Sequence, residues 1–406
     1  YCDSYSQLAY YISSVSDKVF LNPEGGVQFN GLSAGIMFFK GLLDKLGVEV
    51  QIIRHGKFKS AVEPFMYNEM SSENRQQIEQ LLNSITDELI EGVSKQRNIS
   101  VNEINNIINT LQLNSAISCK NLNFVDELKY EDEVNDFMKE KYDHHISFSD
   151  YMKVNYKKNN ISKNKIAIIY ASGEISIGEG SYSSIGSETT VKAIRKAKED
   201  DNVKAIVFRI NSPGGSALAS EIILREITLA KEKKKVVVSM GDYAASGGYY
   251  IACKADKIFA NNTTLTGSIG VFGIMPNVKE FLNDKLGVYV DTVNTHKYSD
   301  LGTGFRQLTS YERSVIQKSV EDIYSTFISH VSQGRGMSVD QVDAIGQGRV
   351  WSGIDAKKLG LIDEIGGLEQ AIICAAELSD LKDYRIITLP KRTDELEELF
   401  KDFSVE

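Results

Sequence analysis

Two stretches of the chain are almost the same sequence: residues 249–259 read YYIACKADKIF, and residues 10–20 read YYISSVSDKVF. The offset between them is 249 − 10 = 239 residues. Further along, LLDKLGVEV from Leu42 parallels LNDKLGVYV from Leu282, and SAISCKNLNFVDE (115–127) parallels SGIDAKKLGLIDE (352–364). A similarity that stays in register over this length indicates an internal duplication. The period is too long for a solenoid unit, so we expect two tandem domains.

The second repeat carries an alternating pattern of strands and helices. Buried strands are expected at KIAIIYASGEI from Lys165, VKAIVFRI from Val203, KVVVSM from Lys235 and KIFA from Lys257. Helices are expected at TVKAIRKAKED (190–200) and at residues 221–232. Strands that alternate with helices predict a mainly parallel sheet with right-handed crossovers. The fold class is therefore α/β, with two tandem domains that each hold a mainly parallel sheet flanked by helices.

The repeat also sets the expected domain boundaries. We expect an N-terminal repeat at 1–150, a linker at 151–164 and a C-terminal repeat at 165–406. The N-terminal repeat lacks the front half that the C-terminal repeat has, and the chain opens with Tyr1 in the middle of the pattern. We therefore expect an upstream part, which would include any membrane anchor.

Composition excludes several classes of protein. The 406 residues are 42% hydrophobic and 25% charged, which is typical of a soluble globular protein. The net charge of −9 argues against an electrostatic grip on nucleic acid. The lysine-rich stretch at 153–165 is interpreted as a solvated linker. The four cysteines are far apart, without metal or redox spacing, so we expect neither a metal nor a cofactor.

The stretch YAASGGYY (243–250) places Ser246 among small residues, between a strand and a helix. Gly215, in the NSPGGS turn (211–216), follows the preceding strand in the same way. Functional groups of parallel sheets gather at the carboxyl ends of the strands, where both fall. The alternative is structural: Ser246 would cap the helix, and NSPGGS would be a plain turn.

The repeat distinguishes one lysine from another. Ser246 corresponds to Gln7 at the first offset, so the N-terminal repeat lacks the serine. Lys59 corresponds to Ser299 at the second offset, so the C-terminal repeat lacks the lysine. Lys57 is matched by Lys297 and is interpreted as structural. Two repeats that each lack what the other holds are typical of a split site.

The residue types suit nucleophilic catalysis. A serine hydroxyl becomes a nucleophile when a base takes its proton, and Lys59 could serve as that base if burial lowered its pKa. Ser268, in TLTGSIGV (264–271), would orient the amine, unless it is a plain turn serine. Backbone N–H groups of Gly215 and Gly247 would stabilise an oxyanion.

Five motifs together resemble the signal peptide peptidase A family, also called protease IV, in its long tandem-repeat form. They are INSPGGS, YAASGGYYIA, TGSIGVFG, GKFKSAVEPF and GRVWSGIDAKKLGLIDEIGG, and the resemblance covers nearly the whole chain. Phe58 stands where the family has tyrosine. The resemblance implies a crotonase/Clp-protease-like fold and a serine peptidase with Ser246 as nucleophile, Lys59 as general base and Ser268 positioning the lysine. It also implies that Gly215 and Gly247 form the oxyanion hole.

The resemblance also implies partners and a location. We expect apolar peptides as substrates, mainly remnants of signal peptides, and a ring-like homo-oligomer such as a homotetramer. We expect the protein at the bacterial inner membrane, held by an N-terminal anchor, with its catalytic part on the extracytoplasmic side. No nucleic acid is expected as a partner.

Three alternatives remain open from the sequence. A histidine could serve as the base, and the candidates are His55, His144, His145, His296 and His330. The same fold supports acyl-CoA chemistry, in which paired amides stabilise an enolate without a nucleophilic serine. A tandem scaffold that binds extended peptides would need no catalysis at all.

Overall fold

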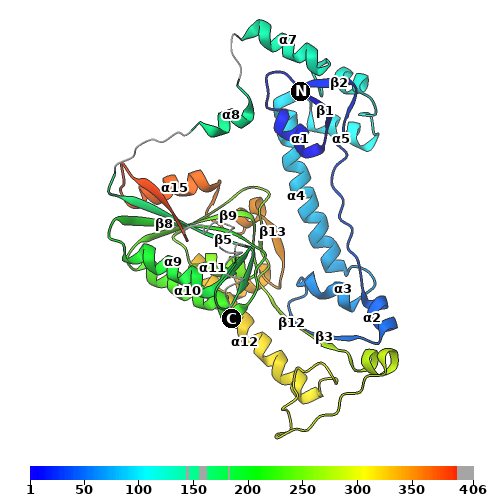
Figure 1. Cartoon of the computed structure of the whole chain (residues 1–406), viewed down its shortest axis with the longest axis vertical. Helices are drawn as coiled ribbons and strands as arrows, with labels where there is room; N and C mark the ends of the chain where they lie inside the picture. Colours follow the sequence, from blue (N-terminus) through cyan, green and yellow to red (C-terminus); the bar gives the residue numbers. More distant parts are fainter. Residues whose placement is uncertain (143–145, 155–161, 182, 391–406) are drawn as a thin grey trace. The chain divides into compact units, whose positions relative to one another are not determined.

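A computed structural model describes residues 1–142, 146–154, 162–181 and 183–390 (Figure 1). The chain divides into two compact units. One comprises Tyr1–Ala34 with Leu82–Asn159, and the other comprises Gly35–Leu81 with Asn160–Glu406. These units do not coincide with the expected boundaries at 1–150, 151–164 and 165–406, because residues 35–81 join the second unit. Part of the expected linker, 155–161, and the terminal residues 391–406 lie outside the described residues.

The second unit is built on a sheet whose strands run in the order β13-β11-β9-β8-β5-β15, with β10 and β14 attached beside β9. Every described pair in it is parallel except β11–β13. The sheet thus confirms the predicted mainly parallel α/β class. The strands are β5 (Lys165–Ser172), β8 (Val203–Ser212), β9 (Lys235–Ala245), β10 (Lys257–Ala260), β11 (Leu265–Gly267), β13 (Val350–Ser352), β14 (Glu364–Ile365) and β15 (Arg385–Leu389).

Successive side chains of the central strands point to opposite faces of this sheet, so a hydrophobic core forms on each face. On β8, Ile206 and Phe208 pack with residues of α9 and α10, whereas Ala205 and Val207 pack with residues of α15. Figure 1 shows α9 and α10 on one face and α15 on the other. The helices are α9 (Ser187–Glu199), α10 (Ala217–Lys231), α11 (Gly247–Ala252), α12 (Ser310–Arg335), α13 (Val339–Ile345), α14 (Gly353–Lys358) and α15 (Leu368–Glu377).

Residues 35–81 join this unit through a second, two-stranded sheet. β3 (Glu49–His55) pairs antiparallel with β12 (Val271–Asn277), from Val271 opposite His55 to Asn277 opposite Glu49. Around them lie α2 (Lys40–Leu46), the 3-10 turn η1 (Ser60–Val62), α3 (Glu63–Met66), the start of α4 (Ser72–Arg97) and the π-helix η2 (Phe281–Leu286). A further pair, β6 (Glu174–Ser176) and β7 (Ser184–Gly186), is parallel. The β3–β12 ladder is the physical reason why this part of the N-terminal repeat belongs with the C-terminal one.

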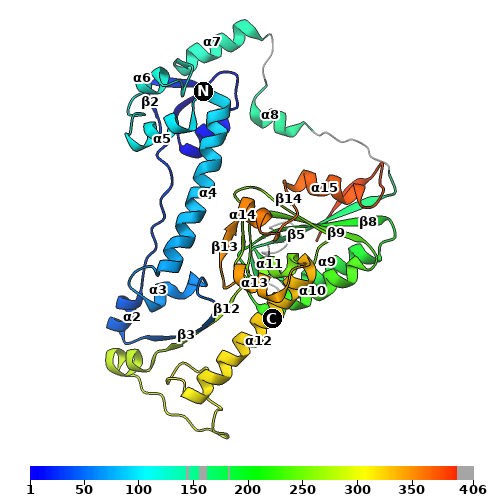
Figure 2. The same cartoon turned by 180° about the vertical axis from the view of Figure 1, so that it is seen from behind.

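The first unit holds a smaller parallel sheet in the order β1-β2-β4. Tyr10, Phe29 and Phe124 form the centre of its core, with Tyr10 stacked on Phe124 at 5.3 Å between ring centroids. The elements are β1 (Cys2–Tyr5), α1 (Gln7–Ser13), β2 (Phe20–Val27), α5 (Val101–Asn109), α6 (Ala116–Asn121), β4 (Glu127–Leu128), α7 (Glu131–Lys141) and α8 (Phe148–Lys153). Figure 2 labels β2, α5, α6, α7 and α8 among them.

The two repeats share individual hydrogen bonds as well as elements. The Tyr10 hydroxyl donates to the Phe124 carbonyl at 2.7 Å, and the Tyr249 hydroxyl donates to the Leu361 carbonyl at 2.8 Å. An aspartate with the same two kinds of partner is also present in both repeats. Asp126 accepts from the Val19 N–H and from Arg97, and Asp363 accepts from the Ile258 N–H and from Arg335. The duplication read from the sequence is therefore present in the packing.

Candidate active site

Ser246 stands between the end of β9 and the start of α11, in a backbone conformation that serine rarely adopts. Its φ is 53° and its ψ is −119°. The Ser246 N–H donates to the Gly267 carbonyl at 2.9 Å, which fixes this turn against β11. The Ser246 side chain makes no capping hydrogen bond to α11. A strained serine whose hydroxyl is not used as a cap is typical of a functional position.

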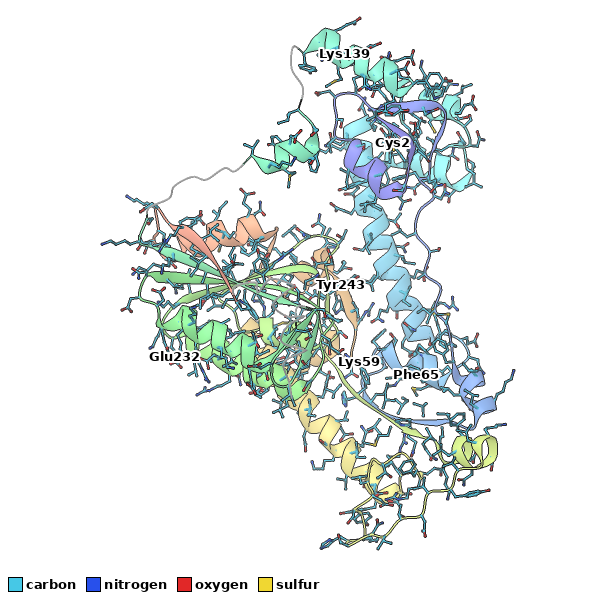
Figure 3. All side chains as sticks on the ribbon, in the orientation of Figure 1. Cys2, Lys59, Phe65, Lys139, Glu232 and Tyr243 are labelled. Carbon is cyan, nitrogen blue, oxygen red and sulfur yellow. The ribbon has the colours of Figure 1, made fainter. Side chains whose placement is uncertain are left out.

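Lys59 reaches Ser246 from the N-terminal repeat, and both residues belong to the second unit. The Lys59 Nζ lies 3.1 Å from the Ser246 Oγ, 2.9 Å from the Ser268 Oγ and 3.0 Å from the Ser268 carbonyl oxygen. The residue is 4% exposed. Burial lowers the pKa of Lys59 to about 7, because desolvation penalises the ammonium form. Figure 3 marks Lys59 and also Tyr243, which lies on β9 three residues before Ser246.

These contacts match the hydrogen-bonding capacity of a neutral amine. A neutral lysine has two N–H donors and one lone pair. The Ser268 carbonyl can only accept, so it takes one N–H, and the Ser268 Oγ can take the other. The lone pair is then left for the Ser246 hydroxyl. Ser268 is itself held, because its N–H donates to the Arg349 carbonyl at 2.7 Å.

The two expected amide donors lie at adjoining strand ends. Ile175 forms a parallel bridge to Gly215, donating its N–H to the Gly214 carbonyl and accepting from the Ser216 N–H. In such a bridge the N–H of Gly215 itself points away from Ile175. A Cβ built on Gly247 would lie 3.2 Å from the Gly215 nitrogen, so the two amides are close.

Glycine is required at these positions by space as well as by conformation. Gly214 and Gly215 have φ of 111° and 150°. A Cβ on Gly215 would lie 2.1 Å from the Ile175 carbonyl oxygen, and one on Gly214 would lie 2.8 Å from the Gly247 nitrogen. The NSPGGS turn is therefore a close junction with the Ser246 turn, which a plain strand-to-helix turn would not need.

Sequence reasoning missed the loop at 346–349, which touches both sides of the lysine. The Phe58 N–H donates to the Gln347 carbonyl at 2.9 Å. Gly348 packs so closely that a Cβ there would lie 2.6 Å from the Lys59 nitrogen. The Arg349 guanidinium lies 4.7 Å from the Phe58 ring and 4.2 Å from the Trp351 ring. These residues stand in the GRVW motif and just before it, so a signal was present, but no residue type in it indicates chemistry.

The described histidines make other contacts. His55 stacks on Tyr324 at 3.9 Å between centroids, and the His330 Nε2 lies 2.9 Å from the Glu221 carboxylate. His296 is exposed, and its Nδ1 lies 3.1 Å from the Thr295 hydroxyl oxygen. None of these three bonds to Ser246 or Lys59 in the part of the chain that the structure covers, and His144 and His145 lie outside that part.

Neither a metal-binding group nor a membrane-spanning helix is found among the described residues. Among them, no group of three or more His, Cys, Asp or Glu side chains could hold a metal ion. None of the described helices combines the length and apolar character needed for a membrane span.

Comparison with known proteins gives the family. The profile of peptidase family S49 matches residues 1–144 and 228–382, which is more than half of the chain. A second profile, the ClpP-like SDH-type serine proteinases, matches residues 154–280 and confirms the expected Clp-protease-like fold there. The chain belongs to peptidase family S49, as the sequence motifs led us to expect.

Individual relatives are similar along almost the whole chain. Protease 4 of Haemophilus influenzae is 38% identical over 93% of this chain and 64% of its own length. Protease 4 of Salmonella typhi is 36% identical over 95% of this chain and 64% of its own. The chloroplastic serine protease SPPA of Arabidopsis thaliana is 36% identical over 94% and 58%. The chain thus spans about three-fifths of the length of these relatives.

Solved structures are also similar. Among them, a point mutant of ClpP1 from Listeria monocytogenes is 18% identical, with a TM-score of 0.35, over 50% of this chain and 94% of that one.

Proposed function

We propose that this protein is a serine endopeptidase in which Ser246 is the nucleophile and Lys59 the general base. The observation that carries the proposal is the 3.1 Å contact between the Lys59 Nζ and the Ser246 Oγ, in a site where burial lowers the pKa of the lysine to about 7. Membership of peptidase family S49 supports it. In this proposal the N-terminal repeat supplies the base, and the C-terminal repeat supplies the nucleophile and oxyanion hole.

The chemistry is acyl transfer in two steps. Neutral Lys59 takes the proton of Ser246 as the Oγ attacks the carbonyl carbon of the peptide bond. The resulting oxyanion is stabilised by the N–H groups of Gly215 and Gly247. The protonated lysine gives its proton to the leaving amine, and the C–N bond breaks. Water then hydrolyses the ester at Ser246, with Lys59 as the base again, while the two oxygens of Ser268 hold the amine in place.

The proposed substrates are apolar peptides, above all cleaved signal peptides. Large apolar side chains stand exposed at positions that neighbour the site in sequence: Ile177 is 61% exposed, Leu218 59% and Tyr243 46%. Ile177 lies two positions after Ile175, which bridges to Gly215, and Leu218 lies two positions after the end of the NSPGGS turn. Such surface suits an apolar segment better than a charged one.

Covalent labelling tests the nucleophile directly. We expect a fluorophosphonate to modify the purified protein at Ser246, as read by peptide mass mapping. Ser246→Ala should abolish both labelling and cleavage of a fluorogenic apolar peptide while leaving the melting temperature nearly unchanged. Labelling elsewhere with Ser246 untouched would favour acyl-CoA chemistry or a peptide-binding scaffold, the two alternatives that need no serine nucleophile.

A homo-oligomer is part of the proposal, and the repeat supports it. Residues 289–295 align with β3, yet they lie outside any helix or strand and are exposed. The counterpart of β12 lies near the matching triplet Gly35–Met37, which is also outside any helix or strand. We propose that these two segments pair between molecules, as β3 and β12 pair within one.

The membrane location is the part of the proposal that rests on the family resemblance alone. An upstream anchor would hold the protein at the bacterial inner membrane with the site on the extracytoplasmic side. Fractionation of cells that express the complete gene product tests it, because recovery in the soluble cytosolic fraction would contradict it.

A further inference from the structure

Glu63 is a carboxylate that the proposed mechanism does not use, and it is 0% exposed. Its oxygens accept from the Ser71 N–H at 3.2 Å, the Ser71 hydroxyl at 2.6 Å and the Asn74 side-chain amide at 2.9 Å. All of these donors are neutral. A buried charge is costly unless a charge of opposite sign compensates it.

Arg54 supplies that charge and also reaches the lysine. Its Nη1 lies 3.7 Å from the Glu63 Oε1 and donates to the backbone carbonyl of Lys59 at 3.1 Å. One guanidinium nitrogen thus faces the buried carboxylate and the backbone of the proposed base. The side chain of Arg54 is 20% exposed, so this contact is largely screened from water.

The backbone of Lys59 is a single tight turn, which makes the carbonyl contact consequential. Lys59 has φ of −75° and ψ of 74°, and the Ser60 N–H donates to the Phe58 carbonyl at 2.8 Å. This is an inverse γ-turn centred on Lys59. Rotation of its carbonyl would change the direction of the side chain. The Arg54 contact therefore fixes where the Nζ points.

We propose that Glu63 and Arg54 are a positioning pair for Lys59: Glu63 fixes the guanidinium of Arg54, and Arg54 fixes the carbonyl of the turn that aims the amine at Ser246. The inference rests on the proposed role of Lys59 as the base. Neither residue touches the reacting atoms, so both act through Lys59.

Other charged groups surround the same turn and must be separated from this effect. Lys57 lies over the Phe58 ring, with its Nζ 5.3 Å from the centroid, and the Arg349 guanidinium lies over the same ring at 4.7 Å. Glu73, near the start of α4, has its pKa lowered first by a hydrogen bond from Ser72 and, among smaller causes, by Lys57 and Arg54. None of these three contacts the Lys59 carbonyl in the described structure.

The test measures the rate at which a fluorophosphonate labels Ser246 as a function of pH, in the wild type and in charge-changing variants. Arg54→Met leaves the Glu63 carboxylate uncompensated, which favours the ammonium form of Lys59. We expect a labelling rate about 10- to 100-fold lower. The limb of the pH profile, which is the rise in rate as Lys59 loses its proton, should move to higher pH by roughly half a unit. Glu63→Gln leaves the Arg54 cation uncompensated, so the limb should move downward. The double variant should return the limb to the wild-type pH while the rate stays low.

Two controls separate positioning from general destabilisation. Glu226 is another glutamate, 2% exposed, which is paired with Arg195 and Lys198 on α9. We expect Glu226→Gln to lower the melting temperature without moving the pH limb. Arg54→Lys keeps the charge, so its limb should stay at the wild-type pH and part of the rate should return. It also provides a measurement if Arg54→Met fails to fold.

The outcomes for the pair and for the base are distinguishable. If Lys59→Ala keeps the limb and rate of the wild type, the proposed function fails. If Lys59→Ala removes the limb, but Arg54→Met and Glu63→Gln leave it in place or move it in the same direction, only the positioning pair is refuted.

Discussion

Residues 49–55 and residues 289–295 hold equivalent places in the two repeats and have different structures. The first set forms β3, with Ile53 1% exposed and paired opposite Gly273. In the second set, the residue at the same offset is Val293, which is 98% exposed. Both sequences continue from the same LDKLGV or NDKLGV motif, so local sequence is similar at the entry. The difference teaches that this segment becomes a strand only where a strand such as β12 is available to pair with it.

The positions of the candidate site differ between the repeats in the same asymmetric way. At the start of α1, Gln7 stands where the C-terminal repeat has the proposed nucleophile, and its side-chain oxygen accepts from the Gly31 N–H at 2.9 Å. At the start of α11, Ser246 makes no such bond to its own backbone and faces Lys59. The N-terminal repeat has therefore filled its turn with a structural contact, whereas the C-terminal repeat keeps the turn open for chemistry.

The largest expected effect comes from removing the lysine that only one repeat has. Lys59→Ala should lower the rate of peptide cleavage about 10²- to 10⁴-fold, because proton transfer by a general base is lost. In the wild type the rate should rise with pH through about 7, where the pKa of Lys59 lies, since only the neutral amine accepts a proton. The matched control is Lys57→Ala, which should stay within a few-fold of the wild type. Equal losses in the two variants would abolish the distinction between shared and unshared lysines.

The next effect compares β3, which is paired with β12, with residues 289–295, which form no strand. Ile53→Ala should lower the free energy of unfolding by roughly 2–5 kcal/mol, as expected for a buried aliphatic residue. Val293→Ala should change it by less than about 0.5 kcal/mol, which is usual for a surface site. Chemical denaturation under dilute conditions measures both. At high concentration, mass photometry should show weaker self-association for Val293→Ala. A loss of stability by Val293→Ala in the isolated molecule would mean that residues 289–295 already pair within it.

A stability effect of opposite sign is expected at Lys59. Its folded pKa of about 7 lies below the value of 10.5 for an unperturbed lysine, so the unfolded chain binds more protons between these two pH values. The free energy of unfolding should therefore rise with pH between about 7 and 10.5. Below pH 7 the buried Lys59 should lower it by the full amount. Lys59→Met should raise the free energy of unfolding at pH 7 by roughly 1–4 kcal/mol. The gain should shrink towards pH 10. A Lys59→Met variant less stable than the wild type at pH 7 would show that burial of the amine does not destabilise the fold.

The smallest effect concerns the orientation of the amine. Ser268→Ala removes one of the two oxygens that accept from Lys59 and leaves the carbonyl, so a loss of about 10-fold in kcat is expected. KM should hardly change, because the serine is not expected to touch the peptide. Steady-state kinetics with the fluorogenic peptide decides between this outcome and a purely structural role, in which only the melting temperature would fall.

The sequence was sufficient to pick out the parts of the candidate site that differ between the repeats. Ser246 and Lys59 were separable because each is missing from the other repeat, and Gly215 was visible in a glycine-rich turn. Arg54, Glu63 and Gln347 could not be found in this way. Each of them makes a backbone or ion-pair contact near Lys59, and no residue type in the sequence indicates such a contact. The unit boundary at residues 35–81 was missed for the same reason, because a strand that pairs with the other repeat has no local signal.

The distance along the chain between Lys59 and Ser246 has a consequence during synthesis. The two residues are 187 positions apart, and Arg349, whose carbonyl holds Ser268, follows later still. At a typical translation rate of about 5–20 residues per second, the lysine leaves the ribosome roughly 10–40 s before the serine. A partly made chain therefore carries the proposed base without the proposed nucleophile. Because the proposed site needs residues from both repeats, it is incomplete until the second repeat has been made and has folded.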